Sequence, residues 1–247
     1  GGAIPEINFK TPNRLKQFLV FAKRDVLSKI SDVQYLLITL LEAPILGLFL
    51  AYLIRYFDES SKDAHYTLYN NSNLPIYIFM SVIVAIFMGL IVSAEEIIKD
   101  RKILKREAFL NLSWNSYLMS KVFVQFIISA VQAFLFVLVG NSITGIHGMM
   151  PEYWLVLFSC WAGANMLGLL ISDSFRTVVT IYILIPFLVI PQIILSGVIV
   201  KFEKLNPNIS SPSVIPLYGE VITARWGYEA LAVKQFISNK FEKQFYD

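Results

Sequence analysis

Residues that commonly build metal and disulfide sites are scarce in this chain. Its 247 residues include one cysteine, Cys160, and two histidines, His65 and His147. A single cysteine cannot form a disulfide within the chain. Neither an HExxH motif nor a CxxC motif is present, so we expect no metal site.

Motifs for nucleotide binding and for nucleophilic hydrolysis are also missing. The sequence has no GxxxxGKS or GxxxxGKT loop, no GxSxG element and no histidine in any long apolar segment. Hydrolysis by a serine inside a membrane would therefore lack its base. The formal net charge of +3 gives no case for a nucleic-acid partner. We expect no catalytic residue and no cofactor in this chain itself.

Long apolar runs, by contrast, are abundant. The chain is 56% hydrophobic and its mean hydropathy is +0.60, which is typical of a polytopic membrane protein. A helix needs about 20 apolar residues to cross a bilayer core of about 30 Å. The segments that meet this need are 33–57, 74–94, 122–140, 153–172 and 178–200. We therefore predict an all-α membrane domain with five spans in 33–200, a lead-in at 1–32 and a polar tail at 201–247.

The distribution of Lys and Arg predicts the orientation of these spans in the lipid bilayer. Six such residues precede the first span and six lie in 95–121, whereas residues 58–73 have one and residues 141–151 have none. Loops rich in Lys and Arg stay in the cytoplasm. The N-terminus and 95–121 are therefore predicted to be cytoplasmic and 201–247 extracytoplasmic, in a membrane such as the bacterial inner membrane.

The segment 95–121, EEIIKDRKILKREAFLNLSWNSYLMSK, is the most densely charged part of the chain. Glu95 and Lys99 have the i,i+4 spacing that supports a helix. Trp114 and Tyr117 are residue types that favour the membrane interface. The pattern predicts an amphipathic helix over 95–118. Two interpretations are open: a solvated loop, or a helix through which a soluble partner acts on the spans.

Two further segments have helical apolar faces outside the spans. Residues 15–30 form an amphipathic pattern that suits either the membrane surface or a soluble partner domain. The tail becomes helical from about Glu220. Its predicted apolar face, expected to lie against the membrane or the span ends, consists of Ile222, Trp226, Ala230, Val233, Ile237 and Phe241.

Polar residues inside the predicted spans are candidate functional groups, because they are costly in hydrocarbon. Glu42 either faces a translocation path, where it could pair with a cation of 95–121, or serves structure only. Gln125, Gln132 and Asn165 suit hydrogen bonds between helices. Gln192 follows Pro186 and Pro191, which predict a break or kink in the fifth span.

Three motifs, in order, resemble those of G-subfamily ABC exporters, which are type-2 ABC permeases. The first consists of Asp100-Arg101, Leu104, Arg106-Glu107, Tyr117 and Ser120-Lys121. The second includes Ser196-Gly197 in LSGVIV and then Arg225, Tyr228 and Glu229 in RWGYEAL. The lead-in LKQFLVFAKRDVL resembles the connecting helix of that family. Asp100 replaces the more common Glu, and Leu104 replaces a usual aromatic residue.

The resemblance implies several properties that the residues alone do not. It implies a sixth span after Asp247 and an ATPase domain on the N-terminal side, which would carry ATP and Mg²⁺. It also implies a second permease copy, with which the chain would form a homodimer around a translocation path. The region 95–118 would then be a coupling helix. The start at Gly1-Gly2-Ala3, without Met, agrees with a piece of a longer protein.

Three functions therefore stand at this stage. The first is the permease of an ATP-driven exporter, which works by alternating access. The second is a unit that uses the ATPase stroke to act on an extracytoplasmic partner without transport. The third is a membrane-embedded enzyme, for which the chain offers no catalytic motif.

Overall fold

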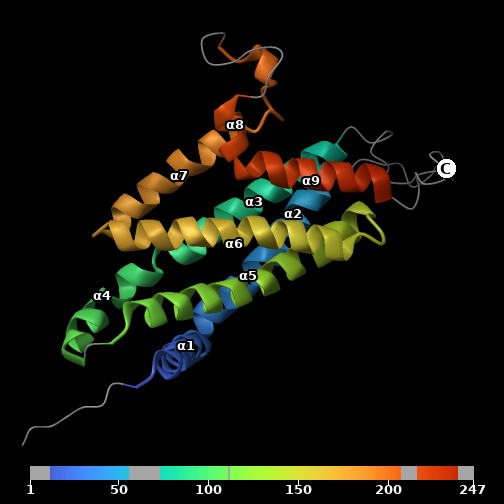
Figure 1. The fold of residues 1–247 in the computed structure, drawn as a ribbon. Coiled ribbons are helices and arrows are strands. Elements are labelled where there is room, and N and C mark those ends of the chain that lie inside the picture. The colour runs from blue at the N-terminus through green and yellow to red at the C-terminus, as the bar shows by residue number, and fades with distance from the viewer. Residues whose placement is uncertain (1–11, 56–72, 111, 207–215, 239–247) are drawn as a thin grey trace, which may run out of the picture.

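A computed structural model describes residues 12–55, 73–110, 112–206 and 216–238, and in those ranges the protein contains helices and no strands. In chain order the helices are α1 (Arg14–Ser31), α2 (Val33–Ile54), α3 (Leu74–Ala94), α4 (Glu96–Glu107), α5 (Trp114–Thr144), α6 (Met150–Ser174), α7 (Val178–Ile194), α8 (Leu217–Val221) and α9 (Thr223–Ser238). Figure 1 shows α3, α5, α6 and α9 running alongside one another, with α1 lying across one end. Short 3₁₀ turns cover Ala108–Leu110 and Phe202–Lys204.

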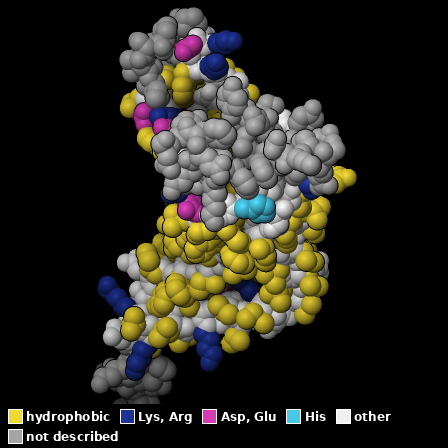
Figure 2. Space-filling view, turned by 90° about the vertical axis from the view of Figure 1, so that its right-hand side faces the viewer, with side chains coloured by type: hydrophobic (Ala, Val, Ile, Leu, Met, Phe, Trp, Pro, Cys, Tyr) yellow, Lys and Arg dark blue, Asp and Glu magenta, His cyan; other side chains and the backbone are white. Residues whose placement is uncertain are grey.

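The all-α polytopic architecture is confirmed. The helices α2, α3, α5 and α6 are long and apolar enough to cross a membrane, and α7 is a shorter apolar helix of 17 residues. In the view of Figure 2, hydrophobic side chains form a broad band with Lys and Arg side chains at its lower edge. This is the surface expected of a domain surrounded by lipid.

The fifth predicted span is shorter than the sequence suggested. The sequence predicted a break or kink at Pro186 and Pro191. A break is not seen, because the chain is helical through both prolines. The helix ends instead at Ile194, and Gly197 follows with a φ of 78°, which a glycine adopts without strain. The range 178–200 was therefore wrong at its C-terminal end, since apolar composition continues beyond the turn.

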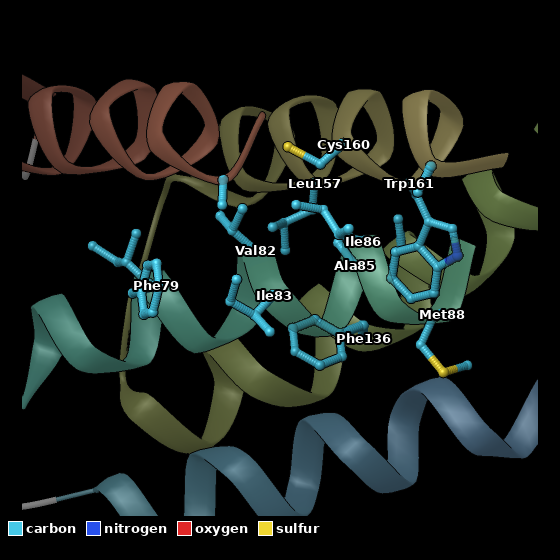
Figure 3. Close-up of a cluster of buried hydrophobic side chains, with 14 of the residues drawn as sticks. Phe79, Val82, Ile83, Ala85, Ile86, Met88, Phe136, Leu157, Cys160 and Trp161 are labelled. Carbon is cyan, nitrogen blue, oxygen red and sulfur yellow. The ribbon is translucent and has the colours of Figure 1, made fainter. Parts of the chain in front are cut away.

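The core is centred on α3, which packs against α6 and also contacts α2, α7 and α9. This helix is hydrophobic on every side, as expected of a helix that is largely surrounded by others. Figure 3 shows its Val82 and Ile86 among Leu157 and Trp161 of α6 and Phe136 of α5. The core therefore lies within the layer of membrane-spanning helices.

The charged segment is divided into separate elements. The prediction of one helix over 95–118 was wrong in its C-terminal part, because α4 ends at Glu107 and α5 begins at Trp114. Ser113 starts the new helix by accepting a hydrogen bond from the Ser116 N–H. Trp114 and Tyr117 thus belong to the third spanning helix.

The tail helix α9 packs within the helical layer and not outside it. A Cβ atom on Gly227 would lie 2.7 Å from the Cys160 sulfur and 2.9 Å from Val82, near the middles of α6 and α3. The predicted apolar face is largely the exposed one: Trp226, Val233 and Ile237 are 49%, 50% and 66% exposed. Of that face, Phe241 lies outside the described residues. Helical periodicity identified a face but not its neighbour.

Candidate functional site

A buried cluster of charged side chains joins α1, α4 and α5. At its centre is Lys121 of α5, which is 4% exposed. Its ammonium nitrogen lies 2.5 Å from Asp25 Oδ1, 3.1 Å from Glu96 Oε2 and 2.9 Å from Asp100 Oδ2. Burial of an ammonium group is costly unless it is paired. The three carboxylates, from α1 and α4, supply that pairing.

Lys29 adds a second cation to this charged cluster. Its Nζ lies 2.7 Å from Asp25 Oδ2 and 2.8 Å from Glu96 Oε2. Burial would raise the pKa of the Asp25 carboxyl, but the ammonium groups of Lys121 and Lys29 outweigh it and hold the pKa below its usual value. The charged cluster (Asp25, Lys29, Glu96, Asp100 and Lys121) therefore contains three anions and two cations.

Aromatic contacts support the same junction. The Tyr117 hydroxyl donates a hydrogen bond of 2.9 Å to Asp100 Oδ2. The Tyr117 ring meets Phe21 of α1 edge to face, with ring centroids 5.6 Å apart. Leu15 and Leu19 of α1 remain exposed. Helix α1 is thus fixed on α5 by one face and leaves part of its apolar surface free.

The start of α4 is held by the end of α6. The Ser172 hydroxyl oxygen accepts the N–H groups of Ile97 at 3.0 Å and Ile98 at 3.1 Å. First-turn N–H groups lack partners within their own helix, so Ser172 acts as a cap supplied by another helix. Arg101 of α4 donates in return to the backbone carbonyls of Ser172, at 3.2 Å, and Asp173, at 2.5 Å. Each helix therefore satisfies backbone groups at the end of the other.

The far end of α4 is tied to α1. Arg24 of α1 forms an ion pair of 2.7 Å with Glu107. Both side chains are partly exposed, so this pair contributes on the order of 0–1 kcal/mol. Gln17 of α1 accepts the Ser113 N–H at 2.7 Å, and the Ser116 hydroxyl donates to the Arg14 carbonyl at 2.9 Å. Helix α1 is thus attached both to the C-terminal end of α4 and to the start of α5.

A cavity of about 590 Å³ lies beside this junction, where α4, the start of α5 and the α6–α7 turn meet. Leu104 lines it together with Arg101, Trp114 and Arg176. Arg106 is exposed and lies away from the charged cluster. The predicted coupling residues therefore have different environments: Asp100, Tyr117 and Lys121 come together, Arg101 contacts α6, and Glu107 contacts α1.

The sequence did not identify several members of the site. Asp25 and Lys29 have i,i+4 spacing on one helix, a signal that could have been followed. Glu96 is adjacent to Glu95, which instead pairs with Lys99 and accepts a hydrogen bond from the Tyr182 hydroxyl of α7. No pattern marked Ser172, because its partners are backbone groups from another helix.

Hydrogen bonds between helices are confirmed for two of the polar residues inside the spans. The Gln132 side-chain nitrogen donates to the Thr39 carbonyl of α2 at 2.9 Å. Asn165 of α6 donates to Ser129 Oγ at 2.5 Å and to the Gln125 carbonyl at 3.3 Å. Both amide atoms of the Gln125 side chain lack partners among the described residues.

Glu42 behaves differently from the amide residues. It is partly exposed on α2. Within the described ranges it forms no ion pair, so the suggested pairing with a cation of 95–121 is not found there.

The second motif connects α7 to α9. Gln192 accepts the Ala224 N–H at 3.0 Å and thereby holds the start of α9. The Ser196 hydroxyl donates to the Ile193 carbonyl at 2.8 Å and accepts the Val198 N–H at 3.3 Å. The Phe202 ring packs so closely on Gly197 that a Cβ there would lie 2.5 Å from it. These contacts form the turn that ends α7.

The remaining residues of the second motif lie on α9. Arg225 lies 3.1 Å from Glu220 and 3.6 Å from Glu229, with its guanidinium 4.6 Å from the centroid of the Trp226 ring. The Tyr228 ring meets Phe79 of α3 edge to face, with centroids 6.1 Å apart. The residues of this motif therefore form side-chain contacts along α9 and join α9 to α3.

Apolar spanning helices, joined at one end by a charged cluster to an amphipathic helix, define an integral multi-pass membrane domain of the permease type. A family model for the ABC-2 type transporter matches residues 16–236. The match covers most of the chain, so the chain belongs to the ABC-2 type transporter family.

A similar protein is known from Mycobacterium tuberculosis (strain ATCC 25618 / H37Rv). The chain is 29% identical to its ABC transporter ATP-binding/permease protein Rv1747 over 157 residues, which cover 60% of the chain. The matched region spans only 17% of the length of that relative. The likeness therefore concerns one part of a longer protein.

Proposed function

We propose that the chain is the permease part of an ATP-driven ABC exporter and that it works by alternating access. The observation that carries this proposal is the charged cluster, since it links α1 and α4 to the spanning helix α5. Ser172 and Arg101 extend the link to α6. A displacement of α4 would therefore move several spanning helices as rigid bodies, which is the type of motion that alternating access requires.

The energy source lies outside this chain. The sequence has no P-loop, whereas the relative from Mycobacterium tuberculosis is named as both ATP-binding and permease. We infer an ATPase domain in the same polypeptide, on the N-terminal side, which holds ATP and Mg²⁺. The exposed side chains Lys102, Lys105 and Arg106 of α4 offer it a contact surface. In this proposal α4 and the N-terminus lie in the cytoplasm, on the side of the ATPase domain.

A second copy of the chain would complete the translocation path. Helix α7 packs on α3 and α9, while Val179, Ile183 and Phe187 remain 70%, 59% and 69% exposed. An apolar face of this kind suits the same face of a symmetry-related copy. We propose that two α7 helices meet across a two-fold axis.

Action on an extracytoplasmic partner without transport is the second candidate. It is favoured by the exposed apolar side chains Leu217 and Val221 of α8, which are 84% and 77% exposed. A transport assay on the intact protein separates the two candidates. Nucleotide-dependent movement of a substrate across vesicles supports the exporter, and ATP hydrolysis without movement of any substrate supports the alternative.

Replacement of Arg106 or Glu107 by alanine in the intact protein tests the role of α4. Glu107→Ala removes the pair with Arg24, and Arg106→Ala removes an exposed cation of the contact surface. Transport per ATP hydrolysed should fall by roughly fivefold or more, which corresponds to about 1 kcal/mol of lost coupling. Insertion into the membrane should be normal. Lys234→Ala on α9 is the matched control, and wild-type coupling in both α4 variants would refute the assignment.

Cysteine cross-linking tests the proposed dimer. Phe187→Cys places a thiol on the exposed face of α7, and mild oxidation in native membranes should produce a covalent dimer because two-fold symmetry brings equivalent residues together. Phe134 of α5 is 45% exposed, and its variant Phe134→Cys should stay monomeric. Equal cross-linking of the two variants would mean that α7 faces lipid.

A further inference from the structure

A second cavity, of about 190 Å³, lies between α1, α2 and α5. Lys29 and Tyr35 line it near the α1–α2 junction, and Thr39 and Gln132 line it further along α2 and α5. The other lining residues are leucine, isoleucine and valine. An apolar cavity of about 150 Å³ is large enough for benzene, so this one can hold a length of alkyl chain with a small polar group.

The cavity is reached from the hydrocarbon side. Leu40, Ile127 and Val131, which line it, are 37%, 48% and 42% exposed on the outer surface of α2 and α5. In a membrane domain this surface is covered by lipid chains. A molecule that enters the cavity therefore comes from the bilayer, and an alkyl chain is the part of a lipid that fits the walls.

Two polar atoms in the lining lack a hydrogen bond: the Tyr35 hydroxyl near the α1–α2 junction and Gln132 Oε1 further along α5. Gln132 is completely buried, and its side-chain nitrogen donates a hydrogen bond to the Thr39 carbonyl. Its Oε1 atom has no partner anywhere in the part of the chain that the structure describes. Thr39 lies seven residues into α2, about 10 Å along the helix from its start. The unpartnered Tyr35 hydroxyl does not donate to Oε1, although both groups line the cavity. A ligand that donates a hydrogen bond to Oε1 therefore gains affinity there.

The charges around the cavity favour a neutral ligand. Lys29 provides the charge in the lining, and its ammonium already lies 2.7 Å from Asp25 and 2.8 Å from Glu96. An anionic head group would compete with these two carboxylates. A cationic head group would face the ammonium. A neutral hydrogen-bond donor avoids both the competition with the carboxylates and the repulsion by Lys29. It also costs less free energy to bury than a charged group.

We propose that this cavity binds a neutral bilayer amphiphile that carries a hydroxyl group on an alkyl chain, such as a monoacylglycerol. The hydroxyl donates to Gln132 Oε1, and the chain lies along Leu36, Leu40 and Val131. The ligand thereby fills the space between α1, α2 and α5 beside the charged cluster. The proposal rests on the cavity and does not depend on transport.

Photoaffinity labelling of the purified full-length protein in lipid nanodiscs tests this site. The probes are octadecanol with a photoreactive diazirine in its chain, the matched methyl ether and the matched carboxylate. The alcohol should label peptides that contain residues 36–40 and 127–132 roughly five- to tenfold more strongly than the ether, the effect of one hydrogen bond to a buried acceptor. Equal labelling by the alcohol and the ether, or stronger labelling by the carboxylate, would overturn the proposal.

Two tryptophan variants locate the labelled site. Val131→Trp blocks the mouth of the cavity, whereas Leu138→Trp changes a residue that is also 42% exposed, two helical turns further along the same face of α5. Labelling by the alcohol should fall at least fivefold in Val131→Trp and stay at the wild-type level in Leu138→Trp. Gln132→Leu should remove the difference between alcohol and ether. Equal labelling of the two tryptophan variants would show that the probe binds elsewhere.

Discussion

Lys121→Met should lower the free energy of unfolding by about 3–5 kcal/mol, the usual cost of removing one partner of a buried ion pair. The methionine side chain fills much of the same space. Among the residues that the structure describes, it leaves Lys29 as the one ammonium paired with this cluster. Equilibrium unfolding in detergent micelles measures the change. Lys23→Met on the exposed side of α1 should stay within about 0.5 kcal/mol of wild type.

The pH dependence of this loss separates charge from packing. In the wild type the pKa of Asp25 is lowered, so its contribution is present above the ordinary value of 3.8 and is lost as pH falls through the lower folded value. In Lys121→Met the Asp25 carboxyl loses one of the two ammonium groups that outweigh its burial, so its pKa rises above the wild-type value. The difference between the two proteins in the free energy of unfolding should therefore narrow as the pH falls from neutral towards the ordinary Asp pKa of 3.8. A difference that stays constant over this range would indicate lost packing instead.

Gly89→Ala should destabilise the contact between α3 and α6 by about 1–3 kcal/mol. A Cβ at this position would lie 2.5 Å from the Trp161 carbonyl oxygen and 2.7 Å from the Ala164 Cβ. Both atoms belong to the backbone or lie next to it, so the helices themselves would have to move apart. Unfolding in micelles measures the loss.

Gly163→Ala is the matched control for this prediction. A Cβ at Gly163 meets nothing within 4 Å, although the residue is on the same helix as Trp161. Alanine has the higher helix propensity, so the variant should be neutral or more stable by up to about 1 kcal/mol. Equal effects at positions 89 and 163 would show that the close approach of α3 and α6 does not control stability.

The sequence predicted the spanning helices well because their signal is local. Apolar composition placed the second span at 74–94, where α3 is found. It failed at the end of α7, since the apolar residues continue beyond the turn at Ser196 and Gly197. It also merged α4 with the start of α5, because a capping residue such as Ser113 is a weak signal within a charged segment.

Only part of the site could be predicted, because several of its residues come from helices that are distant in the sequence. Asp100, Tyr117 and Lys121 belong to one recognisable segment, and the structure brings them together. Their partners Asp25 and Lys29 come from a helix that is distant in the sequence. Ser172 interacts with backbone N–H groups, which every residue has, so no pairing of side-chain types could reveal it.

The sequence by itself determined the class of this protein: hydrophobicity over about 20 residues requires a membrane, and backbone hydrogen bonding in hydrocarbon then requires helices. Motifs in order indicated the family by resemblance, and the family model that matches residues 16–236 shows it. Only the tertiary structure decided which charges share a buried junction and which face of α9 meets α3 and α6. Those features depend on contacts between helices that are far apart in the chain, and a periodic pattern identifies a face without identifying what covers it.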